Sequence, residues 1–150
     1  MIETPKPPRR LFLAGLLAAI AAGGAVTLAG LGALGSPGTE QFQYLRGTSF
    51  SAGEEERLRG FLAGAVKDDR IEVRIIGHSG TQGDGDANLA LSEDRAKGAA
   101  DIARALGIEA DRISAAGVGG GGPLPRPADT SARAHEAALA RVEVILQVRR

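Results

Sequence analysis

The chain of 150 residues contains no cysteine and no tryptophan, and aromatic residues make up only 3 % of it. The lack of cysteine excludes a disulfide framework, a zinc site with thiolate ligands, a cysteine nucleophile and a lipoprotein anchor attached through cysteine. An excess of charge is also missing, because 18 lysine and arginine residues balance 18 aspartate and glutamate residues. Nucleic-acid-binding proteins usually carry a basic excess, so no nucleic-acid partner is expected.

Charged side chains are absent from 25 consecutive positions, 11–35, which follow Lys6, Arg9 and Arg10. A helix of that length, rising about 1.5 Å per residue, is about 37 Å long and exceeds the roughly 30 Å hydrocarbon core of a membrane. The basic flank, residues 1–10, is expected to stay in the cytoplasm, and the rest of the chain to lie outside it. The zero net charge is then a cancellation, because residues 39–150 carry 15 basic and 17 acidic side chains.

Two interpretations of residues 11–35 remain open. An uncleaved transmembrane anchor fits their length and the small residues Gly15, Ala19 and Gly23 at helical spacing. A cleaved export signal fits the basic-then-apolar order and the small residues Ala33 and Gly35 before a possible cleavage point. Both interpretations export the remaining chain, either held at the inner membrane or released into the periplasm.

After a Pro- and Gly-containing linker at 36–39, the period of the apolar residues alternates between that of strands and that of helices. Strands are predicted at 41–50, 70–76, 112–118 and 142–148, and helices at 51–67, 88–106 and 131–139. This order predicts an α/β (α+β) sandwich, βαβαβ(α)β, with helices packed on a sheet of mixed strand direction. Ser51 and Glu54 have the spacing of a capping box for the first helix, and Gly107 that of a C-terminal cap for the second.

Several short patterns resemble metal or catalytic motifs without completing one. His78 and His135 lack the spacing of zinc ligands. Asp84, Asp86 and Asn88 match the first three ligand positions of a calcium loop, but the required glycine and bidentate glutamate are missing. We therefore expect no metal, no cofactor and no enzymatic activity.

One set of segments forms a larger pattern: Gly-His-Ser-Gly at 77–80, Asn-Leu-Ala-Leu-Ser-Glu-Asp-Arg-Ala at 88–96, a Gly-Pro loop at 117–123 and Arg-Val-Glu-Val at 141–144. These segments resemble the OmpA-like C-terminal domain family, whose pattern is G-H-[ST]-D, N-x-x-L-S-x-x-R-A, a Gly-Pro loop and N-R-R-V-[EQ]. The resemblance covers about 40–150. It implies an α/β sandwich with a mixed sheet that binds peptidoglycan noncovalently in the periplasm.

The resemblance also implies how the peptide stem of peptidoglycan is held. A carboxylate after the G-H-[ST] strand meets the ammonium of diaminopimelate, and the arginine of the L-S-x-x-R-A segment, here Arg95, holds a carboxylate. Position 80, where the family has aspartate, is glycine in this chain, and of the last arginine pair only Arg141 remains. Asp84 or Asp86 could supply the missing charge, because Gly-rich sequence surrounds them. The ligand-binding residues implied are Arg95, Asn88, Arg141, Asp84, Asp86, His78 and Thr81.

These departures leave two functions open. The first is a peptidoglycan-binding domain that tethers the inner membrane, through residues 11–35, or an envelope complex to the cell wall. The alternative is a degenerate OmpA-like domain that has lost this binding and serves as a protein-interaction or scaffold module for other envelope proteins.

Overall fold

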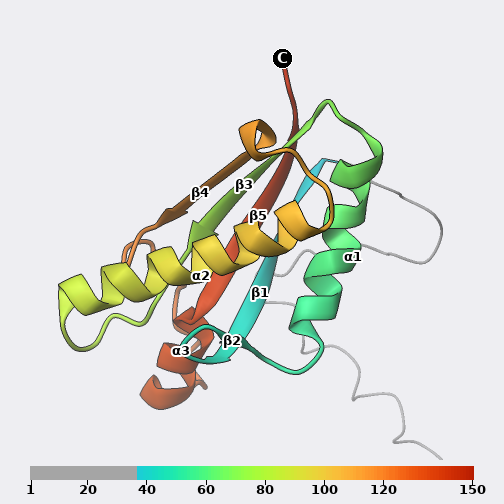
Figure 1. Ribbon diagram of the computed structural model, residues 1–150. Coiled ribbons are helices and arrows are strands. Elements are labelled where there is room, and N and C mark those ends of the chain that lie inside the picture. The colour runs from blue at the N-terminus through green and yellow to red at the C-terminus, as the bar shows by residue number, and fades with distance from the viewer. Residues whose placement is uncertain (1–36) are drawn as a thin grey trace, which may run out of the picture. The chain divides into compact units, whose positions relative to one another are not determined.

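The computed structural model describes residues 37–150, and the predicted basic flank 1–10 and apolar segment 11–35 lie outside the described residues. Within the described part, no helix is long and apolar enough to span a membrane. The elements, in chain order, are β1 (Gly38–Arg46), β2 (Ser49–Phe50), α1 (Glu54–Lys67), β3 (Ile71–Gly77), α2 (Gly85–Ala105), the short 3-10 helix η1 (Ala110–Arg112), β4 (Ile113–Gly117), α3 (Ala132–Leu139) and β5 (Arg141–Val148) (Figure 1).

The strands form one mixed sheet in the order β2-β1-β5-β3-β4. The last strand of the chain, β5, lies in the middle and is antiparallel to both β1 and β3. The β3 and β4 strands are parallel, with α2 in the connection between them. The predicted mixed sheet is therefore confirmed. The single strand predicted at 41–50 is wrong, because a turn at Gly47, whose φ is 52°, divides it into the hairpin of β1 and β2.

Both long helices pack on the same face of the sheet (Figure 1). Strand residues that face them alternate with exposed or half-exposed ones, as the period of two requires: β3 buries Ile71, Val73 and Ile75. α1 contributes Leu58 and Leu62 to the same core, which is filled on the α2 side by alanines.

The capping box predicted for α1 does not form. The N-cap is Gly53 in the left-handed conformation, and no side chain caps the helix. The Glu54 carboxylate instead accepts a hydrogen bond from the backbone N–H of Gln43 in β1, at 2.8 Å. An unpaired strand N–H beside the helix competes for the carboxylate, which is a tertiary contact that the local S-x-x-E spacing does not contain.

The ends of α2 are set by local chemistry. Asp84 is the N-cap, and its carboxylate accepts a hydrogen bond from Ala87 N–H at 2.8 Å, so the helix begins three residues before the predicted start at Asn88. At the C-terminus Gly107 has a φ of 93°, and the N–H of Ile108 reaches back to the carbonyl of Ala103. The cap predicted from Gly107 is therefore confirmed.

α2 lies unusually close to the ends of β3 and β4, and two glycines make this possible. A Cβ on Gly77 would overlap the backbone carbonyl of Ser92, and one on Gly117 would overlap the backbone nitrogen of Glu93. Ser92 is fully buried and accepts a hydrogen bond from the N–H of Gly119 at 2.8 Å. These contacts fix the first half of α2 against the carboxyl ends of the two parallel strands.

Candidate functional site

The residues singled out from the sequence gather at one end of the sheet. His78 and Thr81 follow β3, Asn88 and Arg95 belong to the first half of α2, and Arg141 begins β5. The carboxyl ends of parallel strands are a common place for ligand sites, since the connecting loops meet there. The close packing of α2 on Gly77 and Gly117 brings these segments, distant in sequence, to the same edge.

Arg95 is buried, with 4 % of its surface exposed, and it joins two segments. Its Nε donates to the carbonyl of Gly47 in the β1–β2 turn at 2.7 Å, and its Nη1 donates to the carbonyl of His78 at 2.8 Å. The guanidinium lies over the ring of Tyr44, with 5.0 Å from Cζ to the ring centroid. Among residues 37–150, Nη2 has no hydrogen-bond acceptor. Burial lowers the pKa of Arg95 from its ordinary value, but the group remains a cation at any neutral pH.

His78 is also buried, at 6 % exposure, and lies beside a glycine-rich loop. Its Nδ1 is 3.3 Å from the carbonyl oxygen of Gly121, and its Nε2 is 3.7 Å from the Glu143 carboxylate. Burial lowers the pKa of His78, and the positive charge of Arg141 lowers it further. The ring is therefore neutral at pH 7, and its Nε2 is buried without a hydrogen-bond partner among residues 37–150.

Arg141, the first residue of β5, contacts the same glycine-rich loop. It is 3 % exposed, and its Nη2 donates to the carbonyl of Gly122 at 3.1 Å. Burial lowers the pKa of Arg141. Its Nε is the second buried polar atom in the described part of the chain that lacks a partner. Buried polar groups without partners are rare, so two of them side by side distinguish this end of the molecule.

Thr81 contacts a residue that the sequence analysis missed. Its N–H donates to Glu136 Oε2 at 3.0 Å, and its hydroxyl donates to Glu136 Oε1 at 2.5 Å. Glu136 belongs to α3, and these hydrogen bonds lower the pKa of its carboxyl group. A Cβ added to Gly80 would lie 2.5 Å from Glu136 Oε2. The Glu136 carboxylate therefore occupies the space next to position 80 in which a side chain would begin.

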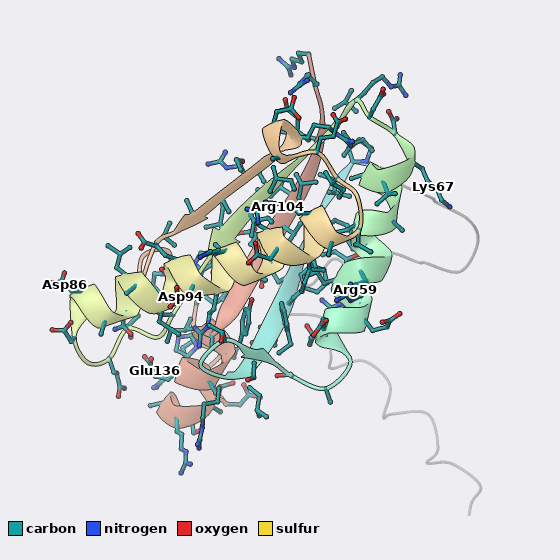
Figure 2. The ribbon with its side chains drawn as sticks, in the orientation of Figure 1. Arg59, Lys67, Asp86, Asp94, Arg104 and Glu136 are labelled. Atoms are coloured by element: carbon teal, nitrogen blue, oxygen red, sulfur yellow. The ribbon has the colours of Figure 1, made fainter. Side chains whose placement is uncertain are left out.

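The loop between β3 and α2 uses its other polar residues internally. Asp84 caps α2, and Asn88 Nδ2 donates to the carbonyl of Gln82 at 2.9 Å. Asp86 is exposed in the first turn of α2. Figure 2 shows Asp86 at the outer end of α2, well apart from Glu136 on α3. The structure thus brings Thr81 together with Glu136, and leaves Asp84 and Asp86 at the helix end.

The described residues contain no group of three or more histidine, cysteine, aspartate or glutamate side chains arranged to hold a metal ion. The charged side chains at this end of the sheet instead include both a cation and an anion. A fixed cation, Arg95, and a fixed carboxylate, Glu136, are both hydrogen-bonded to the segment 78–81.

Several solved structures share this fold. They include a putative MotB-like protein from Desulfovibrio vulgaris (21 % identity, TM-score 0.60, covering 74 % of this chain and 75 % of that one). The peptidoglycan-associated lipoprotein of Burkholderia pseudomallei has 18 % identity and a TM-score of 0.60 over 73 % of this chain and 89 % of that one. The OmpA-like domain of FopA1 from Francisella tularensis has 20 % identity and a TM-score of 0.56 over 75 % of each chain.

No curated protein sequence gives a significant match to this chain. Residues 48–140, however, match the family model described as OmpA family. That match spans β2 to α3 and includes the ends of β3 and β4, the first half of α2 and Glu136 of α3, which belong to the candidate site. By this match and by the fold that accompanies it, the chain belongs to the OmpA family.

Proposed function

We propose that residues 40–150 form a periplasmic domain that binds peptidoglycan noncovalently through the diaminopimelate-containing peptide stem. The observation that carries the proposal is the way in which hydrogen bonds orient the Arg95 guanidinium. Two of its nitrogens are held by the backbone carbonyls of Gly47 and His78, which leaves Nη2 as a donor in a fixed position. A cation that is already oriented loses little freedom when it receives a ligand carboxylate. Family membership and the likeness to a peptidoglycan-associated lipoprotein support the proposal.

The site supports binding rather than catalysis. Its histidine is buried, neutral and bonded to a backbone carbonyl, and its two arginines hold carbonyl oxygens. None of these groups forms a hydrogen-bonded pair of nucleophile and base. We therefore infer a binding module.

Co-sedimentation of the full chain, kept soluble in mild detergent, with purified sacculi tests the proposal. Arg95→Lys keeps the charge and loses the guanidinium fork, and we expect binding at least about tenfold weaker. Lys97→Ala, on the exposed side of α2, is the matched control and should bind like the parent. Thermal melting identifies any loss that comes from unfolding. Equal binding by the parent and Arg95→Lys would reject the assigned role of Arg95, and no binding by the parent would reject the function.

The apolar segment 11–35 completes the proposal as an inner-membrane anchor, so that the domain ties the membrane or an envelope complex to the wall. A cleaved signal would instead release the domain. Mass spectrometry of the protein isolated from cells separates the two, because cleavage before Ser36 removes the whole segment.

The scaffold alternative keeps one specific observation in its favour, the glycine at position 80. Loss of one member of a charged pair typically costs about 2–5 kcal/mol of binding free energy. If the natural chain does not bind sacculi and Gly80→Asp does, the natural domain is a scaffold that has lost its ligand. If the natural chain already binds, this alternative is excluded.

A further inference from the structure

We propose that Glu136 of α3 is the anionic residue of the site and receives the ammonium group of the peptide stem, a role for which position 80 has no side chain. This inference rests on the proposed function, and it assigns the carboxylate to an element that follows position 80 by more than fifty residues. It replaces the hypothesis that Asp84 or Asp86 supplies the charge.

The first argument is space. A Cβ at residue 80 would lie 2.5 Å from Glu136 Oε2 and 3.8 Å from its Cδ, so a side chain at 80 and the carboxylate of Glu136 compete for one volume. Gly80 does not have a positive φ, so its backbone conformation would accept other residue types. The turn therefore does not require glycine at this position, and the space beside it is taken by the Glu136 carboxylate. Glycine at 80 and glutamate at 136 form a compensated pair.

The second argument is charge. Thr81 donates its N–H to one oxygen of Glu136 and its hydroxyl to the other, and these hydrogen bonds lower the pKa of the carboxyl group. The group is therefore ionised at neutral pH and fixed in orientation. A carboxylate offers about four lone-pair sites. Acceptor capacity thus remains for a cation after both hydrogen bonds from Thr81 are made.

The third argument is the position relative to Arg95. Arg95 donates to the carbonyl of residue 78, and Glu136 accepts from the N–H of residue 81. Three extended residues span at most about 11 Å, so the anchoring points of the cation and the anion lie within that distance. The cation and the anion are thus anchored to one short segment, and we infer that a ligand with both an ammonium and a carboxylate contacts the two together. Asp84 caps α2 and Asp86 lies at its outer end, so neither is placed in this way (Figure 2).

The decisive variant is Glu136→Gln in the full chain, tested by co-sedimentation with sacculi. Glutamine removes the charge, keeps one oxygen that can accept from the N–H of Thr81, and places an NH2 group opposite the Thr81 hydroxyl, which can accept from it. We expect binding about tenfold weaker. Glu55→Gln, on α1, removes one negative charge elsewhere and should bind like the parent. Thermal melting confirms that each variant is folded.

Moving the charge back tests the compensation directly. Gly80→Asp with Glu136→Gln should restore binding to within about threefold of the parent. Gly80→Asp alone should not bind more strongly than the parent, because the two carboxylates compete for the same space and repel each other. The Glu136 side chain is long and ends at the surface, so it can move aside and the variant should still fold.

Chemical acetylation of the free amines in the sacculi removes the ammonium from the ligand. Acetylation should weaken binding by the parent about as much as Glu136→Gln does, and should have little further effect on Glu136→Gln. If the two losses multiply, Glu136 does not meet the ammonium and the inference is overturned.

The outcomes for the inference and for the proposed function are distinct. If Glu136→Gln binds like the parent while Arg95→Lys does not, the inference is wrong and the function stands. If the parent fails to bind and Gly80→Asp with Glu136→Gln binds, Glu136 does not compensate for position 80. If no variant binds, the function fails and the inference fails with it.

Discussion

A buried arginine from another element lies at each end of β3, Arg112 of η1 at one end and Arg95 of α2 at the other, and the two make different contacts. At the N-terminal end, Arg112 donates through Nε and Nη2 to the carbonyls of Ile71, Ala65 and Asp68, at 2.6–3.1 Å. Two of these carbonyls belong to the last turn of α1 and the residue after it, which have no partners within the helix. Arg112 therefore holds together the connection between α1 and β3, and all the carbonyls that it contacts belong to the short stretch 65–71.

At the C-terminal end, Arg95 joins two segments that are far apart in the sequence, and its neighbours keep unpartnered polar atoms. His78 Nε2 and Arg141 Nε are buried without a partner, and both lie at this end. Nothing equivalent occurs around Arg112 in the described part of the chain. A buried arginine is thus structural where the polar atoms around it all have hydrogen-bond partners, and is a candidate for ligand binding where buried polar atoms beside it lack partners.

Gly77→Ala should have the largest effect, because it disrupts the packing at the end of the sheet that contains the candidate site. The new Cβ would overlap the carbonyl of Ser92, which is backbone and cannot rotate away, so α2 must move off β3. We expect the free energy of unfolding to fall by about 4 kcal/mol, at or above the usual cost of overpacking. Urea denaturation measures it. A loss below about 1 kcal/mol would show that α2 adapts and does not fix the site.

Arg112→Met tests whether the other end is purely structural. Removing the guanidinium takes a hydrogen bond from three backbone carbonyls, although the Asp68 carbonyl still accepts from the N–H of Ile71, and we expect a loss of about 3 kcal/mol in the free energy of unfolding. Sacculus binding per folded molecule should not change, in contrast to Arg95→Lys. If Arg112→Met weakens binding as much as Arg95→Lys, the two ends are not distinct.

The stability of the domain should fall as the pH is lowered below about 6.5, because of His78. Burial and the charge of Arg141 hold the folded pKa of His78 below its ordinary value, while the nearby Glu143 opposes this. The unfolded chain therefore binds the proton first, and the stabilisation present above the unfolded pKa is lost as the pH falls towards the folded pKa. Urea denaturation between pH 7.5 and 5 should show this smaller effect, and His78→Gln should flatten it. An unchanged pH dependence in His78→Gln would assign the effect to other groups.

Gly98→Ala is the matched comparison for Gly77→Ala and should have the smallest effect. Gly98 lies inside α2, where a Cβ would meet no atom within 4 Å. Alanine favours the helix, so the free energy of unfolding should rise by about 0.7 kcal/mol with unchanged sacculus binding. A destabilised Gly98→Ala would mean that α2 tolerates added volume nowhere along its length.

Much of the fold was accessible from the sequence because its signals are local. The alternation of β3, the helical spacing of α2 and the glycine after it depend on residues within a few positions of one another, and each was confirmed. The prediction of a capping box at Ser51 is wrong because the Glu54 carboxylate accepts a hydrogen bond from a strand N–H eleven residues away. The hairpin of β1 and β2 was missed because Phe42, Tyr44 and Phe50 are separated by even numbers of residues, which also fits one continuous strand.

The candidate site likewise has a part that the sequence predicts and a part that it does not. The motif residues could be named from the sequence through the family resemblance, but their hydrogen-bond partners could not. Glu136 gave no signal, since it is one charged residue in a short helix, and its contact with Thr81 spans 55 positions. The sequence signal lay at the other partner, the glycine at position 80 where the family pattern has aspartate, but only the structure shows that Glu136 lies beside it.

The order of the longer strands and helices, the lack of cysteine chemistry and the difference in charge between residues 1–38 and 39–150 follow from the sequence, because they depend on composition and short-range periodicity. Which charged side chains come together depends on the packing of the elements. The sheet places β5 between β1 and β3, and α2 closes on the glycines of the strand ends. That packing buries Arg95 against two carbonyls and brings a carboxylate from α3 to Gly80, because contact between distant residues depends on how the elements pack.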